Sequence, residues 1–72
     1  NVDAIEVSVV KGCRYIRKKI TIDQIPEELC IGAICRNNKM IIPNNHTEIY
    51  AEDELLVITK DENISKAEKL FQ

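Results

Sequence analysis

The sequence is poor in aromatic residues, glycine and proline. Its 72 residues include one Phe, two Tyr, no Trp, two Gly and two Pro. With so few aromatic side chains, a hydrophobic core must be built mainly from Ile, Leu, Val and Ala. The two glycines form no recurring spacing, which argues against a glycine-rich phosphate-binding loop. Any nucleotide cofactor is therefore expected in another domain.

Soft metal ligands and catalytic patterns are also scarce. The three cysteines, Cys13, Cys30 and Cys35, form no CxxC pair, and His46 is the one histidine. This spacing argues against a zinc site or a disulfide framework, and free thiols suit the cytosol. No apolar run is long enough to span a membrane. Since no Ser-His-Asp or Cys-His arrangement can be argued, the chain is expected to be neither an enzyme nor a metalloprotein.

The chain is short and close to electrical balance. A domain of this length buries only about 60% of the surface that its unfolded form exposes, so we expect a partner chain to complete its core. Ten Lys and Arg against twelve Asp and Glu give a net charge of −2, which indicates neither nucleic acid nor an anionic membrane as a partner. Because the sequence begins at Asn1 without an initiator Met, we interpret residues 1–72 as one domain of a longer protein.

Alternating apolar residues predict strands in the first and last thirds of the chain. In residues 4–12, Ile5, Val7 and Val9 alternate with polar side chains, and Gly12 marks the end of the strand. Residues 55–59 predict another strand, and the three acids at positions 52–54 before it are expected to form a solvated turn. Residues 13–29 predict an irregular connection with a short turn of helix, which Pro26 prevents from continuing.

The middle of the chain predicts a hairpin. Residues 30–36, CIGAICR, are apolar on both faces, as is typical of a central strand covered on both sides. Asn37 and Asn38 tolerate the positive φ of a tight turn, after which KMIIP resumes the extended pattern. Pro43 cannot donate to a strand ladder and marks the end of this strand, and Asn44 with Asn45 begin another turn.

The C-terminal residues predict a helix. One helical face carries the apolar residues Ile64, Ala67, Leu70 and Phe71. The expected N-cap is Asn63 or Asp61, and Lys69 lies near the C-terminal end, where the helix dipole favours positive charge. Together these elements predict an α+β domain in the order strand, irregular segment, two strands, turn, strand, helix.

Polar residues near the hairpin form a candidate ligand-binding site. Its members are Arg36, Asn37, Asn38, Pro43 and His46. Arginine presents a planar fork of donors that suits phosphate or carboxylate, and asparagine amides can bind a base or ribose edge. The structural alternative is that Arg36 caps a turn or pairs with an acid such as Glu48 across an interface, because turn chemistry alone explains the Asn and Pro residues. Both interpretations stay open.

A run of basic residues lies before the hairpin. Lys11, Arg14, Arg17, Lys18 and Lys19 make up half of all the Lys and Arg in the chain. A solvated face, or a charge match between subunits, is favoured over a nucleic-acid surface because Tyr15 is the one aromatic residue among them. The run is nevertheless a candidate site for an anion.

The segment AICRNNKMIIPNNHTEIYAEDELLVIT, residues 33–59, resembles the core of the TrkA-C domain, the C-terminal regulatory domain of RCK proteins. An apolar strand ends in Arg36, a second ends in Ile42 and Pro43, and an acidic turn with Asp53 precedes a third. The upstream AIEVSVVKG and the terminal ENISKAEKLF fall where that family has its first strand and last helix. The resemblance therefore spans nearly the whole chain.

The resemblance implies a small β-X-β-β-X-β-α domain that pairs into a homodimer, and four apolar residues of the hairpin are the expected interface: Ile31, Ile34, Ile41 and Ile42. It implies a cytoplasmic domain that senses a small-molecule ligand and controls potassium transport at the inner face of the membrane, through a transporter subunit. No cofactor is expected in this domain, whereas NAD(H) or ATP would belong to an N-terminal lobe.

The ligands of this family include cyclic di-adenylate in some members and bind near the segment that matches residues 36–43. The sequence departs from the diadenylate-binding pattern. That pattern has an acid two positions before the arginine, where Ile34 stands here, and a longer spacer to the proline. The resemblance therefore indicates a ligand-sensing domain without naming its ligand.

The sequence also leaves room for three alternatives. The chain could regulate another ion or solute transporter, or serve as a purely structural dimerisation module. A small DNA-binding swapped-hairpin barrel would use Lys11 to Lys19 to contact phosphates, but the overall acidity of the chain argues against it and no nucleic-acid partner is expected.

Overall fold

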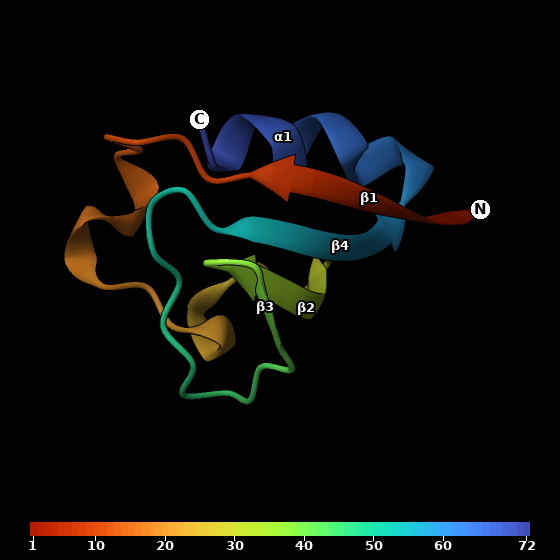
Figure 1. Ribbon diagram of the computed structural model, residues 1–72. Helices are drawn as coiled ribbons and strands as arrows, with labels where there is room; N and C mark the ends of the chain where they lie inside the picture. The colour runs from red at the N-terminus through yellow and green to blue at the C-terminus, as the bar shows by residue number, and fades with distance from the viewer.

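Four antiparallel strands form one sheet, and a C-terminal helix packs beside it (Figure 1). The structure is a computed structural model that describes residues 1–72. Its elements are β1 (Val2–Ser8), β2 (Cys30–Arg36), β3 (Lys39–Ile41), β4 (Glu54–Lys60) and α1 (Ile64–Leu70). The order of strands across the sheet is β1-β4-β2-β3. The predicted α+β class and the order of elements along the chain are confirmed.

The pairing of β1 with β4 follows the alternation expected from the sequence. Val7 lies opposite Leu55 and Ile5 opposite Val57 on the face that meets the core. The chain leaves this region through Gly12, whose φ of 84° is one that an L side chain adopts only with strain. The end of the first extended segment is therefore fixed by the one residue type that accepts this conformation freely.

Replacing Gly12 with alanine tests this turn. No atom lies within 4 Å of the position that an added Cβ would occupy, so the substitution creates no clash and isolates the backbone strain. We expect the free energy of unfolding to fall by roughly 1 to 2 kcal/mol in urea denaturation. Unchanged stability would contradict the positive φ at this position.

A bulge at Gly32 decides which residues of β2 face the core. Ile31 pairs with Val57 and Ala33 with Leu56, so Gly32 is an extra residue between two regular pairs. Strict alternation would place Ile31 and Ile34 on opposite faces, but both are buried, with 7% and 0% of their surface exposed. The expectation that these two residues form a dimer interface is wrong, because their side chains are enclosed within one chain.

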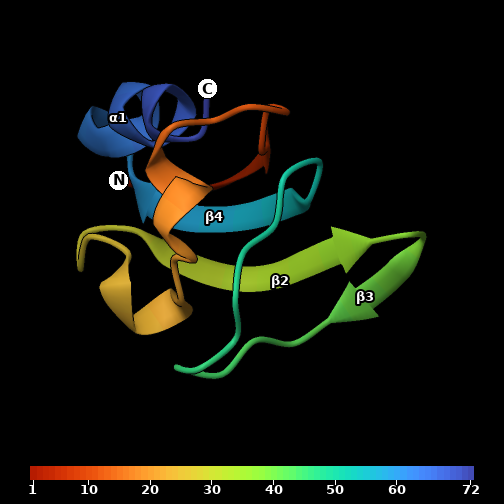
Figure 2. The same ribbon diagram turned by 90° about the vertical axis from the view of Figure 1, so that its left-hand side faces the viewer.

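Two connecting segments cover one face of the sheet (Figure 2). The first contains the short 3-10 helices η1 (Tyr15–Lys18) and η2 (Ile22–Gln24), which confirms the irregular connection with a turn of helix. The second runs from β3 to β4. They are joined by backbone hydrogen bonds from Ile22 to Thr47 and from Ile49 to Ile20, each 3.0 Å long.

The core lies between this face, the two connections and α1. Ala67 and Phe71 are fully buried, and Phe71 meets Tyr15 edge-on with ring centroids 5.8 Å apart. Asn63 occupies the N-cap of α1, as predicted, but its side chain makes no capping hydrogen bond. Twelve hydrophobic residues are buried: Val7, Val9, Cys13, Ile25, Leu29, Ile31, Ile34, Ile49, Leu55, Val57, Ala67 and Phe71.

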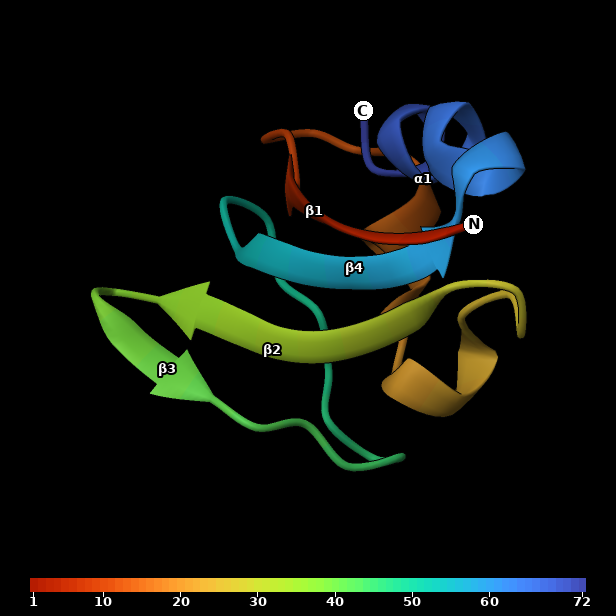
Figure 3. The same ribbon diagram turned by 90° about the vertical axis from the view of Figure 1, so that its right-hand side faces the viewer.

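No other segment of this chain covers the opposite face of the sheet. No helix or loop crosses β4 and β2 on the side that Figure 3 turns to the viewer. On β2, β3 and β4 the register places six apolar or thiol side chains on this side, and we call these six the open face: Cys30, Ala33, Cys35, Met40, Leu56 and Ile58. The expectation that β2 is covered on both sides is therefore wrong for a single chain.

A pair of carboxyl groups lies where β1 begins and β4 ends. A hydrogen bond with Asp3 raises the pKa of Asp61 above its ordinary value, with smaller contributions from desolvation and from the charge of Asp3. The folded chain therefore holds a proton on Asp61 more tightly than the unfolded chain does. Its stability is accordingly expected to fall as the pH rises through and above the ordinary range of an aspartate, about 4.

Thermal melts across this range test the carboxyl pair. The substitution Asp3→Asn should remove the fall in melting temperature between mildly acid and neutral pH, because Asp61 then loses the carboxyl group that shares its proton and, with it, the like charge. Glu62→Gln removes an equal charge from the neighbouring position and should leave the fall in place. A pH profile that Asp3→Asn does not change would contradict the interaction.

Candidate functional site

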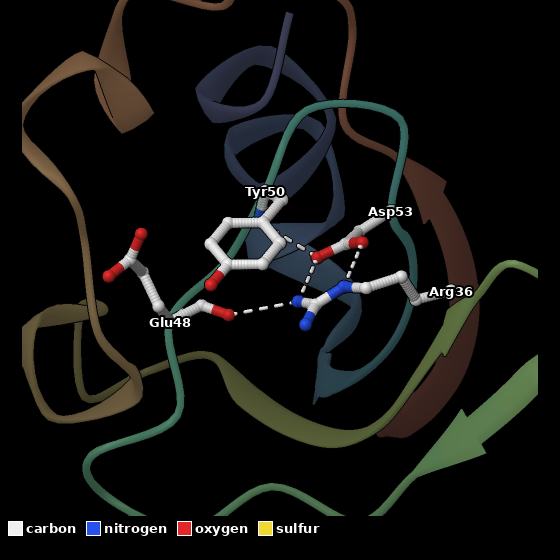
Figure 4. A network of polar contacts seen from close by, with 4 residues as sticks. All are labelled: Arg36, Glu48, Tyr50 and Asp53. Carbon is white, nitrogen blue, oxygen red and sulfur yellow. Dashed lines mark hydrogen bonds and ion pairs between the residues drawn. The ribbon is translucent and has the colours of Figure 1, made fainter.

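Arg36 and Asp53 form the more enclosed of the two ion pairs in the molecule (Figure 4). The Arg36 Nε donates to Asp53 Oδ1 at 2.8 Å, and Nη2 donates to Oδ2 at 2.7 Å. The Asp53 side chain is 1% exposed and the Arg36 side chain 22% exposed. This two-pronged geometry is the strongest arrangement that a guanidinium and a carboxylate can make.

The sheet register explains why these two residues meet. Cys35 of β2 pairs with Glu54 of β4, so Arg36 and Asp53 occupy the next opposed positions beyond the ladder. Arg36 also follows Ile34 by two residues and points to the same, core-facing side as that buried side chain. The expectation of a solvated acidic turn is therefore wrong for Asp53, which is buried while Glu52 and Glu54 are exposed.

Two further residues complete the network. Arg36 Nη2 also donates to the main-chain carbonyl of Glu48 at 2.9 Å, and the Tyr50 N–H donates to Asp53 Oδ2 at 2.8 Å. The guanidinium carbon lies 4.0 Å from the centre of the Tyr50 ring, a cation–π contact. Figure 4 shows the Glu48 carboxylate turned away from the guanidinium. The network thus ties the end of β2 to the segment that leads into β4.

The electrostatics of the network keep Arg36 charged. Its hydrogen bonds to Asp53 raise the pKa of the Arg36 guanidinium, which outweighs the opposing effect of partial burial. Asp53 in turn accepts three hydrogen bonds, two from Arg36 and one from Tyr50. Both charges are therefore compensated, as buried ions require. This supports the structural alternative for Arg36, with Asp53 as its partner and not the side chain of Glu48.

The structure does not bring the five predicted site residues together. Asn37 and Asn38 form the β2–β3 turn with φ values of 52° and 62°, which confirms the predicted tight turn. His46 lies at the other end of the hairpin, in an exposed turn where its N–H donates to Asn44 Oδ1 at 2.8 Å. Pro43 is half-buried between them. The predicted site is thus divided into two turns, with Arg36 beside the first.

Sequence reasoning missed the roles of Glu48, Tyr50 and Asp53 in this network. Asp53 stands among three consecutive acids, and nothing in their pattern separates the buried one from its exposed neighbours. An available signal was the arginine itself, because an Arg that ends a buried strand needs a nearby carboxylate. The resemblance to the TrkA-C domain, which includes an acidic turn with Asp53, was a second signal for the same residue.

The network leaves a small part of Arg36 free for a ligand. Its Nη1 makes no hydrogen bond to the protein, and the neighbouring Tyr50 is 47% exposed. A donor nitrogen beside an aromatic face can bind an anionic group or a flat ring. The arrangement contains no nucleophile with an adjacent base.

The His, Cys, Asp and Glu side chains form no cluster suited to a metal ion, since no group of three or more is placed to hold one. The three cysteines are unpaired, with Cys13 buried and Cys30 and Cys35 exposed. None of the helices has the length and apolar character needed to cross a bilayer.

Comparison with known proteins identifies the family. A family model described as the TrkA-C domain matches residues 4–72. The Trk system potassium uptake protein TrkA homolog of Archaeoglobus fulgidus is 39% identical over 64 residues, which is 89% of this chain and 15% of that protein. A solved structure described as an RCK domain with cda has a TM-score of 0.79, covers 96% of this chain and 97% of its own, and is 20% identical.

The structural likeness extends over the whole fold, from β1 to α1, and the family match covers all of the elements that build the Arg36 network. The family is regulatory and non-catalytic, which confirms the expectation that the chain is not an enzyme. The chain belongs to the TrkA-C domain family.

Proposed function

We propose that this chain is the regulatory domain of a protein that controls potassium uptake, in which two copies pair and a small ligand shifts the geometry of the pair. The observation that carries the proposal is the family match over residues 4–72, together with a potassium uptake protein as a relative. The chain spans only 15% of that relative, so the transporter subunit, the inner face of the membrane and an NAD(H)- or ATP-binding lobe belong to the proposal.

The open face is the surface that we assign to pairing. Met40 is 73% exposed, and Leu56 and Ile58 are 37% and 36% exposed, although they occupy the middle and edge of the sheet. Cys35, Met40 and Leu56 help to line a shallow, mainly apolar groove of about 410 Å³ on this face. A second copy would remove these side chains from water, which offsets the small core of one chain.

Part of the sequence-based interface remains in this assignment. Ile42 is 70% exposed just past β3, and Ile41 is half-buried. Both belong to the same hairpin as Met40, so a copy seated on the open face at this edge of the sheet can reach Ile42. The pairing surface is therefore proposed to combine Ile42 with the open face in place of Ile31 and Ile34.

The ligand is proposed to reach the Arg36 network from the solvent side. The free Nη1 of Arg36 and the exposed ring of Tyr50 can hold an anionic or aromatic group. A related fold has been solved as an RCK domain with cda, which supports a nucleotide-like ligand for the fold. The diadenylate-binding pattern has an acid at the position of Ile34. In this structure Ile34 is 0% exposed, so this position offers no carboxylate to a ligand.

Regulation requires only that the ligand bind one arrangement of the pair better than another. Couplings of this kind are about 1 to 3 kcal/mol in typical cases. The Arg36 network connects the end of β2 with the segment before β4, and both strands contribute to the open face. A ligand that draws Arg36 toward solvent would thus act on the surface that pairs.

The pairing is tested by analytical ultracentrifugation of the 72-residue chain. We expect a dimer that Leu56→Asp converts to a monomer, because the aspartate would be buried without a partner. Val10→Asp is the matched control: Val10 is 48% exposed but lies outside the open face, so this variant should remain dimeric. A monomer at high concentration in the unmodified chain would contradict the proposal.

Ligand sensing is tested by thermal shift against cyclic di-adenylate, ATP, NADH and divalent ions. A ligand that binds only the folded state raises the melting temperature. The substitution Tyr50→Leu should abolish that rise while the chain remains folded and dimeric. A dimer whose melting temperature responds to none of these compounds would favour the purely structural module.

A further inference from the structure

The first connection carries a cluster of basic residues that the proposed function does not use. Lys11, Arg14, Arg17, Lys18 and Lys19 are all exposed, and η1 lies in their midst. The molecule contains two ion pairs, Arg36–Asp53 and Lys66–Glu28, and neither involves these residues. We call the five side chains the basic surface.

Few acids oppose this surface. No acidic residue lies between Glu6 and Asp23 in the sequence. The segments packed against it bring two acids into its neighbourhood: Glu52, whose N–H donates to the carbonyl of Val9, and Glu48, which pairs with Thr21. Neither carboxylate pairs with a residue of the surface. Because the chain as a whole carries a net charge of −2, its remaining residues are strongly acidic and the charge is unevenly distributed.

The shape of the surface decides what kind of anion it fits. The molecule has two cavities, and none of the five basic residues lines either of them. The one aromatic residue of the segment, Tyr15, turns its ring against Phe71 and donates its hydroxyl to the carbonyl of Gln24 at 3.1 Å. The surface thus has no pocket for a small anion and no free ring on which a nucleic-acid base could stack.

An extended anionic surface, such as a bilayer, can bind these residues without a pocket or a free aromatic ring. Where clusters of four to eight Lys and Arg are held close to a membrane, they bind anionic head groups through the negative surface potential, without a pocket or a stacking partner. Val10, which adjoins the first of the basic residues, is 48% exposed and offers an apolar contact at the same edge. We propose that the basic surface docks this domain onto a bilayer that contains anionic lipid. The uneven charge would orient the acidic remainder of the chain away from the bilayer.

Co-sedimentation with lipid vesicles tests the proposal on the 72-residue chain. We expect binding to phosphatidylcholine vesicles that contain phosphatidylglycerol, no binding to phosphatidylcholine alone, and release as salt is raised to about 1 M. The triple variant Arg14→Gln, Arg17→Gln and Lys18→Gln should weaken binding about fivefold for each charge removed. Arg14→Lys with Arg17→Lys keeps the charge and should bind like the unmodified chain.

A matched control removes three charges elsewhere. Lys39→Gln, Lys60→Gln and Lys69→Gln change the net charge equally but lie outside the basic surface, so binding should persist. Circular dichroism verifies that each variant is folded. Four results would overturn the proposal: equal binding to neutral vesicles, equal loss in the control, tighter retention on duplex DNA at the same salt, or salt-sensitive self-association through these residues without vesicles. None of these readouts depends on pairing through the open face or on a small ligand.

Discussion

Replacing Arg36 with alanine is expected to lower the free energy of unfolding by about 3 to 5 kcal/mol, the usual cost of leaving one member of a buried ion pair alone. Asp53 is 1% exposed and would lose two of its three hydrogen bonds. The carbonyl of Glu48 and the face of the Tyr50 ring would also lose their contacts with the guanidinium. Urea denaturation followed by circular dichroism measures the change.

The control for this substitution is Lys39→Ala. Lys39 is the cross-strand partner of Arg36, but it is exposed and forms no ion pair. Its removal should change stability by no more than about 0.5 kcal/mol. The double variant Arg36→Ala with Asp53→Ala should lose less than the two single variants added together, because it leaves no unpaired charge. Additive losses would show that the two side chains are not coupled.

Replacing Phe71 with alanine should have a comparable effect although this residue is next to the end of the chain. Its side chain is 0% exposed and packs edge-on against Tyr15. Removing a buried phenyl ring costs about 3 to 5 kcal/mol, a large part of the stability of so small a domain. The ring also connects α1 with the first connection, where the main-chain carbonyl of Phe71 accepts the N–H of Val10 at 2.9 Å.

Two variants bracket this prediction. Phe71→Leu keeps most of the apolar volume and should lose clearly less than the alanine variant. Leu70→Ala alters the preceding, half-buried residue and should also cost less. A Phe71→Ala chain with the unfolding midpoint of the unmodified protein would show that the C-terminal end is not part of the core.

The local features of the fold could be predicted from the sequence because neighbouring residues determine them. Asn37 and Asn38 belong to the residue type that best tolerates positive φ after glycine, so the hairpin was predictable from its turn. The stripe from Ile64 to Phe71 likewise identified the C-terminal helix. These predictions rest on turn chemistry and periodicity alone.

The predictions that failed depend on which strands become neighbours. Ile31 and Ile34 share a face only because β2 bulges against β4, and no pattern within β2 reveals that pairing. Asp53 is buried because the same pairing sets it beside Arg36. The predicted site therefore included the right arginine but the wrong partners. Its other residues were chosen because they are close to Arg36 in the sequence, whereas Asp53 is close to Arg36 across the sheet.

The extra residue at Gly32 has a consequence for comparing family members of different length. It adds one residue to β2 without changing the side to which later residues of that strand point, because Ile31 and Ala33 pair with consecutive residues of β4. A relative that lacks this position would keep an isoleucine inward and an arginine opposite its carboxylate. Deletion of Gly32 or of Ala33 is thus expected to leave the ion pair in place, because either change removes the extra residue. A deletion at Cys35 would instead turn either the arginine or Ile34 to the outside.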